Sequence, residues 1–212
     1  MTANSTHTSS GSARARLEDD LAIRFVNTAA WRLRTPFEER LPNADALLDW
    51  LAANDLASRE SLSALSRAWR RDPQRSQSVY AAAMRLREAI YEVLIARMAG
   101  RAPLPAALDV LNGLLGRAAQ GAEVKWRSGD LVWCVRPDDD PALLRPIIVS
   151  AVDLVTGPRR KRVKQCQDDR GCGWLFVDES RAQNRRWCSM GDCGNRAKAH
   201  RHYLRARRDD RF

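Results

Sequence analysis

Two short cysteine pairs, Cys166-Gln-Asp-Asp-Arg-Gly-Cys172 and Cys188-Ser-Met-Gly-Asp-Cys193, decide the fold of the C-terminal part of this chain. Fifteen residues separate the pairs, so four of the five cysteines lie within 28 residues. Each pair can bring two thiolates to one metal ion at a small cost in loop-closure entropy. Zn²⁺ prefers four such ligands in tetrahedral geometry. The spacing therefore predicts one structural zinc ion held by Cys166, Cys172, Cys188 and Cys193.

Two disulfides are the alternative interpretation of these cysteines. Disulfides persist in oxidising compartments, whereas residues 1–12 are polar and lack the apolar centre of an export signal. We therefore expect reduced thiols and a cytoplasmic protein. Cys134 lies about 30 residues before the cluster and is expected to be a free thiol, because four ligands are already present. His200 and His202 could replace a cysteine, but four thiols make this unnecessary.

The segment from residue 158 to residue 212 contains few aliphatic side chains, namely Val163, Leu175, Val177 and Leu204. So small an apolar content hardly allows folding by burial alone. A bound zinc ion supplies on the order of 10 kcal/mol of folding free energy. The size of the segment thus independently favours a metal.

Positive charge is concentrated in the same segment. Residues 158–212 hold 16 Lys/Arg against 7 Asp/Glu, a net +9, whereas residues 1–157 hold 20 against 19, a net +1. A basic surface of this kind binds polyanions through neutralised phosphates and released counterions. We therefore expect a nucleic-acid partner. No run approaches the ~18 apolar residues of a membrane span, so no membrane partner is expected.

The remainder of the chain is expected to be mainly helical. Residues 1–16 are polar and predicted to be disordered. Apolar spacing and capping residues predict helices over about residues 17–35, 44–53, 59–71, 74–99 and 105–120. The first could instead have a strand-like start. Its polar pair, Asn27 and Thr28, either lines a cavity or caps or kinks the helix.

A change of period marks a β-hairpin after the fifth helix. Val124, Trp126, Leu131, Trp133 and Val135 alternate with other residues around Ser128-Gly129-Asp130. Asp140-Pro141 then predicts the start of a further helix, which extends to Gly157-Pro158. Pro146 either kinks that helix or marks its true start. We place the domain boundary at residue 157, which gives a helical domain over residues 17–157 and a zinc domain over residues 158–212.

Within the zinc domain, residues 174–177 are expected to form a strand, and residues 185–187 a second extended segment leading to Cys188. A terminal helix from about residue 194 to 208 follows Cys193. The predicted fold is mainly α: a multi-helix domain with one β-hairpin, then a treble-clef-like zinc finger built from a short hairpin and a terminal helix. The candidate nucleic-acid contacts are Arg185, Arg186, Asn195, Arg196, Lys198, Arg201, Arg205 and Arg208.

Several of these residues also allow structural roles. Asn195 could cap the helix or hold the metal loop, and Arg196 could pair with Asp178. Trp174 and Trp187 are expected to form a small core, with base stacking as the alternative.

Residues 193–196, Cys-Gly-Asn-Arg, together with Arg185-Arg186-Trp187-Cys188-Ser189-Met190 and the run from Cys172 to Asp178, resemble the CGNR zinc-finger family. The first 150 or so residues, with Phe25-Val26-Asn27-Thr28, resemble the ABATE domain, which accompanies this finger in bacterial stress-induced transcription regulators. The resemblance implies a zinc-dependent DNA-binding regulator that is not an enzyme, with Cys166, Cys172, Cys188 and Cys193 as ligands.

The leading hypothesis is a transcription regulator in which the finger binds double-stranded DNA and the helical domain dimerises or senses a small molecule. The alternative is a zinc scaffold that binds RNA or another protein without reading DNA sequence. A zinc hydrolase is disfavoured, because a full thiolate shell leaves no position for an activated water.

Overall fold

The computed structural model describes residues 20–120, 122–127, 130–135 and 143–209. The N-terminal segment that was expected to be disordered therefore lies outside the described residues. The elements in chain order are α2 (Leu21–Val26), β1 (Ala29–Ala30), β2 (Glu38–Glu39), α3 (Ala44–Ala53), α4 (Arg59–Arg71), α5 (Pro73–Met98), α6 (Pro105–Gln120), β3 (Ala122–Arg127), β4 (Asp130–Val135), α7 (Arg145–Thr156), the 3₁₀ turn η2 (Pro158–Lys161), β5 (Val163–Gln165), β6 (Leu175–Val177), the π-helical turn η3 (Met190–Gly194) and α8 (Asn195–Asp209).

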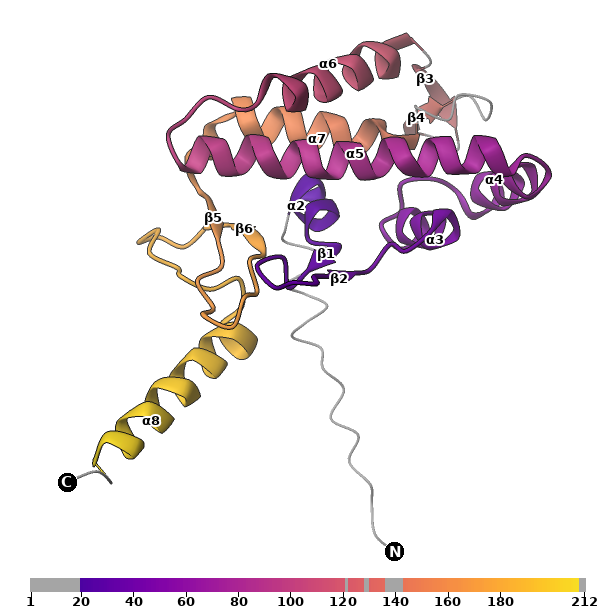
Figure 1. Cartoon of the computed structure of the whole chain (residues 1–212). Helices are drawn as coiled ribbons and strands as arrows, with labels where there is room; N and C mark the ends of the chain where they lie inside the picture. Colours follow the sequence, from indigo (N-terminus) through magenta and orange to yellow (C-terminus); the bar gives the residue numbers. More distant parts are fainter. Residues whose placement is uncertain (1–19, 121, 128–129, 136–142, 210–212) are drawn as a thin grey trace, which may run out of the picture.

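The long helix α5 is the centre of the helical part. Its buried side chains recur at spacings of three and four and include Val79, Ala83, Leu86, Ile90 and Leu94. The helices α2, α3 and α4 pack on one side of α5 and α6 on the opposite side, with α7 between α2 and α6 (Figure 1). Among the described residues, no helix combines the length and apolarity needed to cross a lipid bilayer.

The helix boundaries follow the capping residues of the sequence. The side chain of Asn43 accepts a hydrogen bond from the Ala46 amide at the start of α3, and Ser58 accepts one from Ser61 at the start of α4. Pro146 lies in the first turn of α7, so it marks the start of that helix rather than a kink. The expected start at residues 140–141 falls outside the described residues.

The first helix is much shorter than expected. The periodicity predicted a helix to about residue 35, but α2 ends at Val26, and Ala29 and Ala30 pair with Glu39 and Glu38. The chain leaves the helix because Thr28 donates from its hydroxyl to the Phe25 carbonyl over 2.7 Å, a local bond that competes with helix continuation. Leu33 lies within the residues expected to be helical, and in this turn it is 57% exposed.

The expected β-hairpin is present as β3–β4, with Val124 opposite Trp133 and Trp126 opposite Leu131. Its side chains lie outside the described residues, so the free thiol at Cys134 stays a prediction. A second hairpin, β5–β6, pairs Val163 with Val177 and precedes the finger's terminal helix. Residues 185–187, expected as an extended segment, contain no strand.

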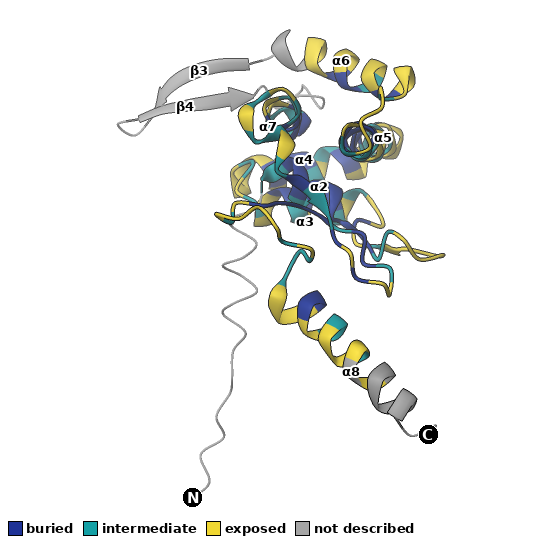
Figure 2. Cartoon of the chain, turned by 90° about the vertical axis from the view of Figure 1, so that its left-hand side faces the viewer, coloured by how far each residue is buried: buried dark blue, intermediate teal, exposed yellow. Residues whose placement is uncertain are grey.

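The aliphatic side chains of the zinc part do not form a core of their own. Val163, Leu175 and Val177 belong to the same hydrophobic cluster as the helices α2 to α7. The size argument from the sequence was therefore incomplete, because it counted only the apolar residues inside the segment. In contrast, α8 leads away from the body of the molecule, and most of its described residues are exposed (Figures 1 and 2).

Candidate metal centre

The fold brings the four predicted ligands together. Cys166 follows β5 and Cys172 precedes β6, so the hairpin carries the first pair, while Cys188 and Cys193 come from the loop and turn before α8. Their four sulfur atoms all lie within 4.8 Å of one another. The Sγ atom of Cys188 is 3.9 Å from that of Cys172 and 3.7 Å from that of Cys193. Four sulfurs at about 2.3 Å from one zinc ion are about 3.8 Å apart, which fits this cluster.

The electrostatics of the cluster also favour a cation. Hydrogen bonds from Cys172 and Cys188 lower the pKa of the Cys166 thiol to about 2. The pKa values of the other three thiols are raised. The hydrogen bond with Cys166 raises the pKa of Cys172 and of Cys188, and burial raises the pKa of Cys193. Thiols this close together oppose one another's ionisation. Four thiolates coexist here only beside a divalent cation, whose binding displaces the remaining protons.

The buried carboxylate of Asp178 holds the loop that carries the second ligand pair. It accepts hydrogen bonds from the backbone amides of Ser180 and Arg185 and from the Lys164 ammonium at 2.7 Å. Burial alone would raise the pKa of Asp178, but the hydrogen bonds from Lys164 and Ser180 outweigh it and lower that pKa below its usual range. The loop is thus fixed by one ionised side chain.

The first metal loop is also held from the helical part. The amides of Arg32 and Leu33 donate to the carbonyls of Cys172 and Gly171 over 3.1 and 3.3 Å. Gly171 and Gly173 have φ values of 91° and 66° in the left-handed region. A Cβ atom on Gly173 would lie 2.7 Å from Cγ of Leu33, so glycine is needed for this close approach.

Asn27 forms a second link to the zinc part. Its amide donates to the Leu175 carbonyl over 2.8 Å and accepts from the Leu175 amide over 2.9 Å. The side chain therefore bonds both backbone polar groups of one residue in β6. Of the two roles expected for the polar pair, capping is confirmed: Asn27 is the C-cap residue of α2, and the Thr28 hydroxyl donates to the Phe25 carbonyl. The side chain of Asn27 additionally joins two distant parts of the chain.

Three candidate nucleic-acid contacts point toward the metal loops. Arg185 donates to the Cys188 carbonyl over 2.8 Å, and the Asn195 side chain donates to the Gly191 carbonyl over 3.0 Å. Arg196 donates to the Cys193 sulfur over 2.9 Å and pairs with Asp168 at 3.3 Å. The partner expected for Arg196 was Asp178. That expectation was wrong, because Asp178 is already paired with Lys164.

The other candidate nucleic-acid contacts whose side chains the structure describes are exposed: Arg186, Lys198 and Arg201. Arg186 donates to the Gln167 side chain over 2.9 Å, and Arg186 and Arg201 lie 5.4 and 5.8 Å from the ring centre of Trp187. Trp174 and Trp187 pack against the cysteine cluster, which confirms them as its small core. Arg205 and Arg208 belong to α8, but their side chains lie outside the described residues, as does that of His202.

His200 takes no part in the metal cluster. Its Nδ1 atom is 2.9 Å from the Asp169 carboxylate, and the group of four sulfurs is complete without it. Four thiolates close a tetrahedral shell, which is the arrangement of a structural zinc site.

Family models match nearly the whole described chain. Residues 19–158 match the ABATE family, described as "Putative stress-induced transcription regulator", and residues 162–206 match the CGNR zinc finger. All four clustered cysteines lie within the second match. Neither model is that of an enzyme family. No curated protein sequence matches the chain significantly.

Proposed function

We propose that this chain, which belongs to the ABATE family and carries a CGNR zinc finger, is a transcription regulator that binds double-stranded DNA through its terminal helix. The observation that carries the proposal is the exposure of Lys198 and Arg201 on α8, a helix that extends away from the body (Figure 2). The surrounding segment, residues 158–212, contributes +9 of the net charge of +10.

The basic candidate residues of the finger fall into two groups, those bonded to the metal loops and those with exposed side chains. Arg185 and Arg196 bond to the metal loops, so their guanidinium groups are already committed within the protein. Lys198, Arg201 and Arg186 have exposed side chains that can reach phosphate oxygens. By helical spacing, Arg205 and Arg208 extend the stripe of Lys198 and Arg201 along α8. This stripe supplies sequence-independent affinity for a duplex backbone.

Zinc acts in this proposal as a structural ion. It fixes the two cysteine loops, and α8 begins two residues after Cys193, so the orientation of the basic helix follows from the metal centre. The closed thiolate shell offers no position for a substrate or an activated water. We therefore assign no catalytic role to the chain.

For the helical domain we propose dimerisation or the binding of a small effector. A groove of about 450 Å³ lies beside the C-terminal end of α5, lined by Val93, Arg97, Gly100, Arg101, Pro103 and Val155. It combines apolar walls with the Arg97 guanidinium, so it suits a small anion that also has an apolar part, such as a carboxylate. Thermal-shift measurements with small carboxylates, on the full chain and on Arg97→Ala, test this part of the proposal.

The test of DNA binding compares two double variants of equal charge. Lys198→Ala/Arg201→Ala removes two exposed charges from α8, and Arg67→Ala/Arg70→Ala removes two exposed charges from α4. Fluorescence anisotropy of the zinc-loaded full chain with random-sequence duplex DNA is measured between 50 and 200 mM salt. We expect the α8 variant to bind DNA more weakly. The slope of log K for association against log salt should become less steep by about 1.8, because each lost phosphate contact reduces its magnitude by about 0.9.

The control variant on α4 is expected to bind like the parent chain. Equal losses in both variants would show a general charge effect and contradict a binding stripe on α8. Single-stranded RNA is measured in parallel, and tighter binding to RNA than to duplex DNA would replace the DNA proposal by the RNA alternative.

A further inference from the structure

The hydrogen bond between Arg196 and the Cys193 sulfur indicates a role for Arg196 at the metal centre rather than in nucleic-acid contact. One Zn²⁺ and four thiolates carry a net charge of −2, and Cys166, Cys172 and Cys193 are buried. A buried charge of this size is unfavourable unless a counter-charge and hydrogen bonds accompany it. The Nη2 atom of Arg196 supplies both, at 2.9 Å from Cys193 Sγ.

The neighbouring carboxylate does not cancel this charge. Asp168 has a side chain with no exposed surface, and its carboxylate pairs with Arg196 at 3.3 Å and with Arg170 at 3.5 Å. The two guanidinium groups and this carboxylate together carry a net charge of +1, and Arg196 is the one of the two that contacts a thiolate. The same carboxylate also fixes the direction of the Arg196 side chain.

A tryptophan from the helical domain lies over this arrangement. The Trp31 ring packs against the cysteine cluster, with the guanidinium carbons of Arg34 and Arg196 at 3.8 and 5.2 Å from its ring centre. The backbone of Trp31 has φ 51°, a left-handed conformation that is unfavourable for a bulky residue. Such a conformation persists only where surrounding contacts impose it.

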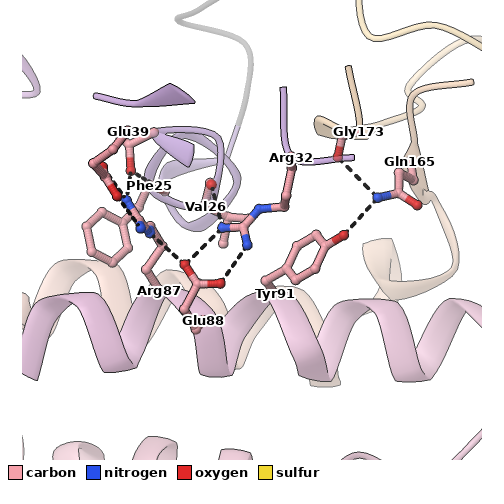
Figure 3. Close-up of polar contacts among 10 residues, drawn as sticks. Phe25, Val26, Arg32, Glu39, Arg87, Glu88, Tyr91, Gln165 and Gly173 are labelled. Atoms are coloured by element: carbon pink, nitrogen blue, oxygen red, sulfur yellow. Dashed lines mark hydrogen bonds and ion pairs between the residues drawn. The ribbon is translucent and has the colours of Figure 1, made fainter. Parts of the chain in front are cut away.

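The contacts that impose it run from the metal loop to α5. The next residue, Arg32, bonds through its amide to the Cys172 carbonyl, and its guanidinium pairs with Glu88 of α5 at 2.5 Å. Figure 3 shows Arg32 between Glu88 and Tyr91, with the Tyr91 hydroxyl bonded to Gln165, whose amide also donates to the Gly173 carbonyl. Arg32, the residue next to Trp31, is thus anchored both to the metal loop and to the central helix.

We propose that the metal centre of this protein is completed by Arg196, as the counter-charge of the thiolates, and by Trp31, as a cover supplied by the helical domain. Arg196 stabilises the charged shell through the Cys193 sulfur. Trp31 keeps water and competing ligands away from the same side. Retention of zinc by the finger therefore depends on a residue of the other domain, whether or not the protein binds DNA.

The Arg196 part is tested by metal release. The zinc-loaded full chain and its Arg196→Gln variant are mixed with a chromogenic chelator, and the transfer rate is followed. We expect Arg196→Gln to release zinc about 10 to 100 times faster, in proportion to the 10- to 100-fold loss of metal affinity that follows removal of a residue hydrogen-bonded to a metal ligand. In the Co²⁺-substituted protein, loss of the N–H to sulfur bond is expected to shift the sulfur-to-cobalt charge-transfer band, which a merely structural effect would leave in place.

Lys198→Gln is the matched control, since it removes one exposed charge two positions further along α8. It is expected to leave both the release rate and the band unchanged. A parent-like rate and band in Arg196→Gln would overturn this assignment. If the glutamine variant does not fold, Arg196→Lys is measured instead, because it keeps the positive charge. A parent-like release rate and band in Arg196→Lys would support the role of Arg196 as the counter-charge.

The cover is tested with Trp31→Ala and Trp31→Phe, against Phe37→Ala as an exposed aromatic control nearby. We expect Trp31→Ala to release zinc about tenfold faster or more, Trp31→Phe to lie between it and the parent chain, and the Co²⁺ band to keep its position in both. Urea unfolding with excess zinc separates faster release from loss of folding. If Trp31→Ala is unfolded, the zinc release rate of Trp31→Phe is used instead. A parent-like release rate would then contradict the role of Trp31 as a cover.

Discussion

The side chain of Asn27 joins the helical and zinc parts through two buried hydrogen bonds. Replacing it by alanine removes both hydrogen bonds and leaves the amide and carbonyl of Leu175 buried without these partners. Unsatisfied buried backbone groups cost about 1–3 kcal/mol each, so for two groups we expect Asn27→Ala to lower the free energy of unfolding by about 2–6 kcal/mol. Urea unfolding of the zinc-loaded protein measures this change.

Asn112→Ala is the control, because Asn112 is an exposed residue within α6. Alanine has a higher helix propensity than asparagine, so this variant is expected to be unchanged or slightly more stable. If Asn27→Ala were as stable as Asn112→Ala, the link through Leu175 would carry no stability.

The residue scale also shows what spacing can predict. The four ligands followed from the sequence because zinc ligation imposes a local pattern on cysteines. Asn27 and Trp31 could not be found that way, since their partners lie more than a hundred residues away. Charge alone made Arg185 and Arg196 look equivalent to Lys198, because a sequence does not reveal which guanidinium turns toward a carbonyl or a sulfur.

At the scale of elements, apolar periodicity predicted α3 to α6 and capping residues fixed their ends. These helices place one face on a shared core, so local pattern and tertiary structure agree. The segment after α2 is the exception. Its apolar spacing continues through Leu33, but contacts with Cys172 and Gly171 determine its backbone, and these outweigh a weak helical preference.

The pairing of that segment with α5 predicts a pH dependence at Glu88. Burial would raise the pKa of Glu88, but the hydrogen bonds and charges of Arg32 and Arg87 outweigh it and lower the pKa. A lowered folded-state pKa adds stability that is fully present above the unfolded value of about 4.3 and is lost as pH falls through the folded value. We therefore expect Glu88→Gln to be less stable at pH 7, by about 1 kcal/mol for a half-exposed pair, and the difference to shrink below about pH 4.

The readout is the difference in urea midpoint between the two proteins in the same buffers, because acid also removes zinc from both. Glu60→Gln, an exposed change at the start of α4, is the control and should show a small, nearly constant difference. A Glu88→Gln difference that stays constant from pH 7 to pH 3 would rule out this ion pair as its source.

At the scale of the whole molecule, composition predicted two parts and the structure connects them. The charge and the cysteines do divide the chain near residue 157, where one family match ends and the next begins. The apolar residues do not follow this division, because Val163, Leu175 and Val177 complete the core of the helices. A core shared in this way is invisible to any count made within one segment.

This shared core predicts how the protein responds to removal of zinc. If the finger were an independent unit, a chelator would unfold it and leave the thermal transition of the helices unchanged. Instead, losing the metal should free β5 and β6, and with them the burial of Val163, Leu175 and Val177. That burial contributes about 5 kcal/mol. In a chain of this size the loss corresponds to a midpoint lower by about 10–20 °C.

Calorimetry with and without chelator measures the shift, and zinc added back after dialysis should restore the original midpoint. Hydrogen exchange supplies a local check, since the amides of Arg32 and Leu33 donate to the metal loop and should lose protection when zinc is removed. Two separate transitions, of which the upper one ignores the chelator, would show that the helical core stands without the finger. A single transition that moves with the metal instead makes zinc an integral part of the folded helical domain.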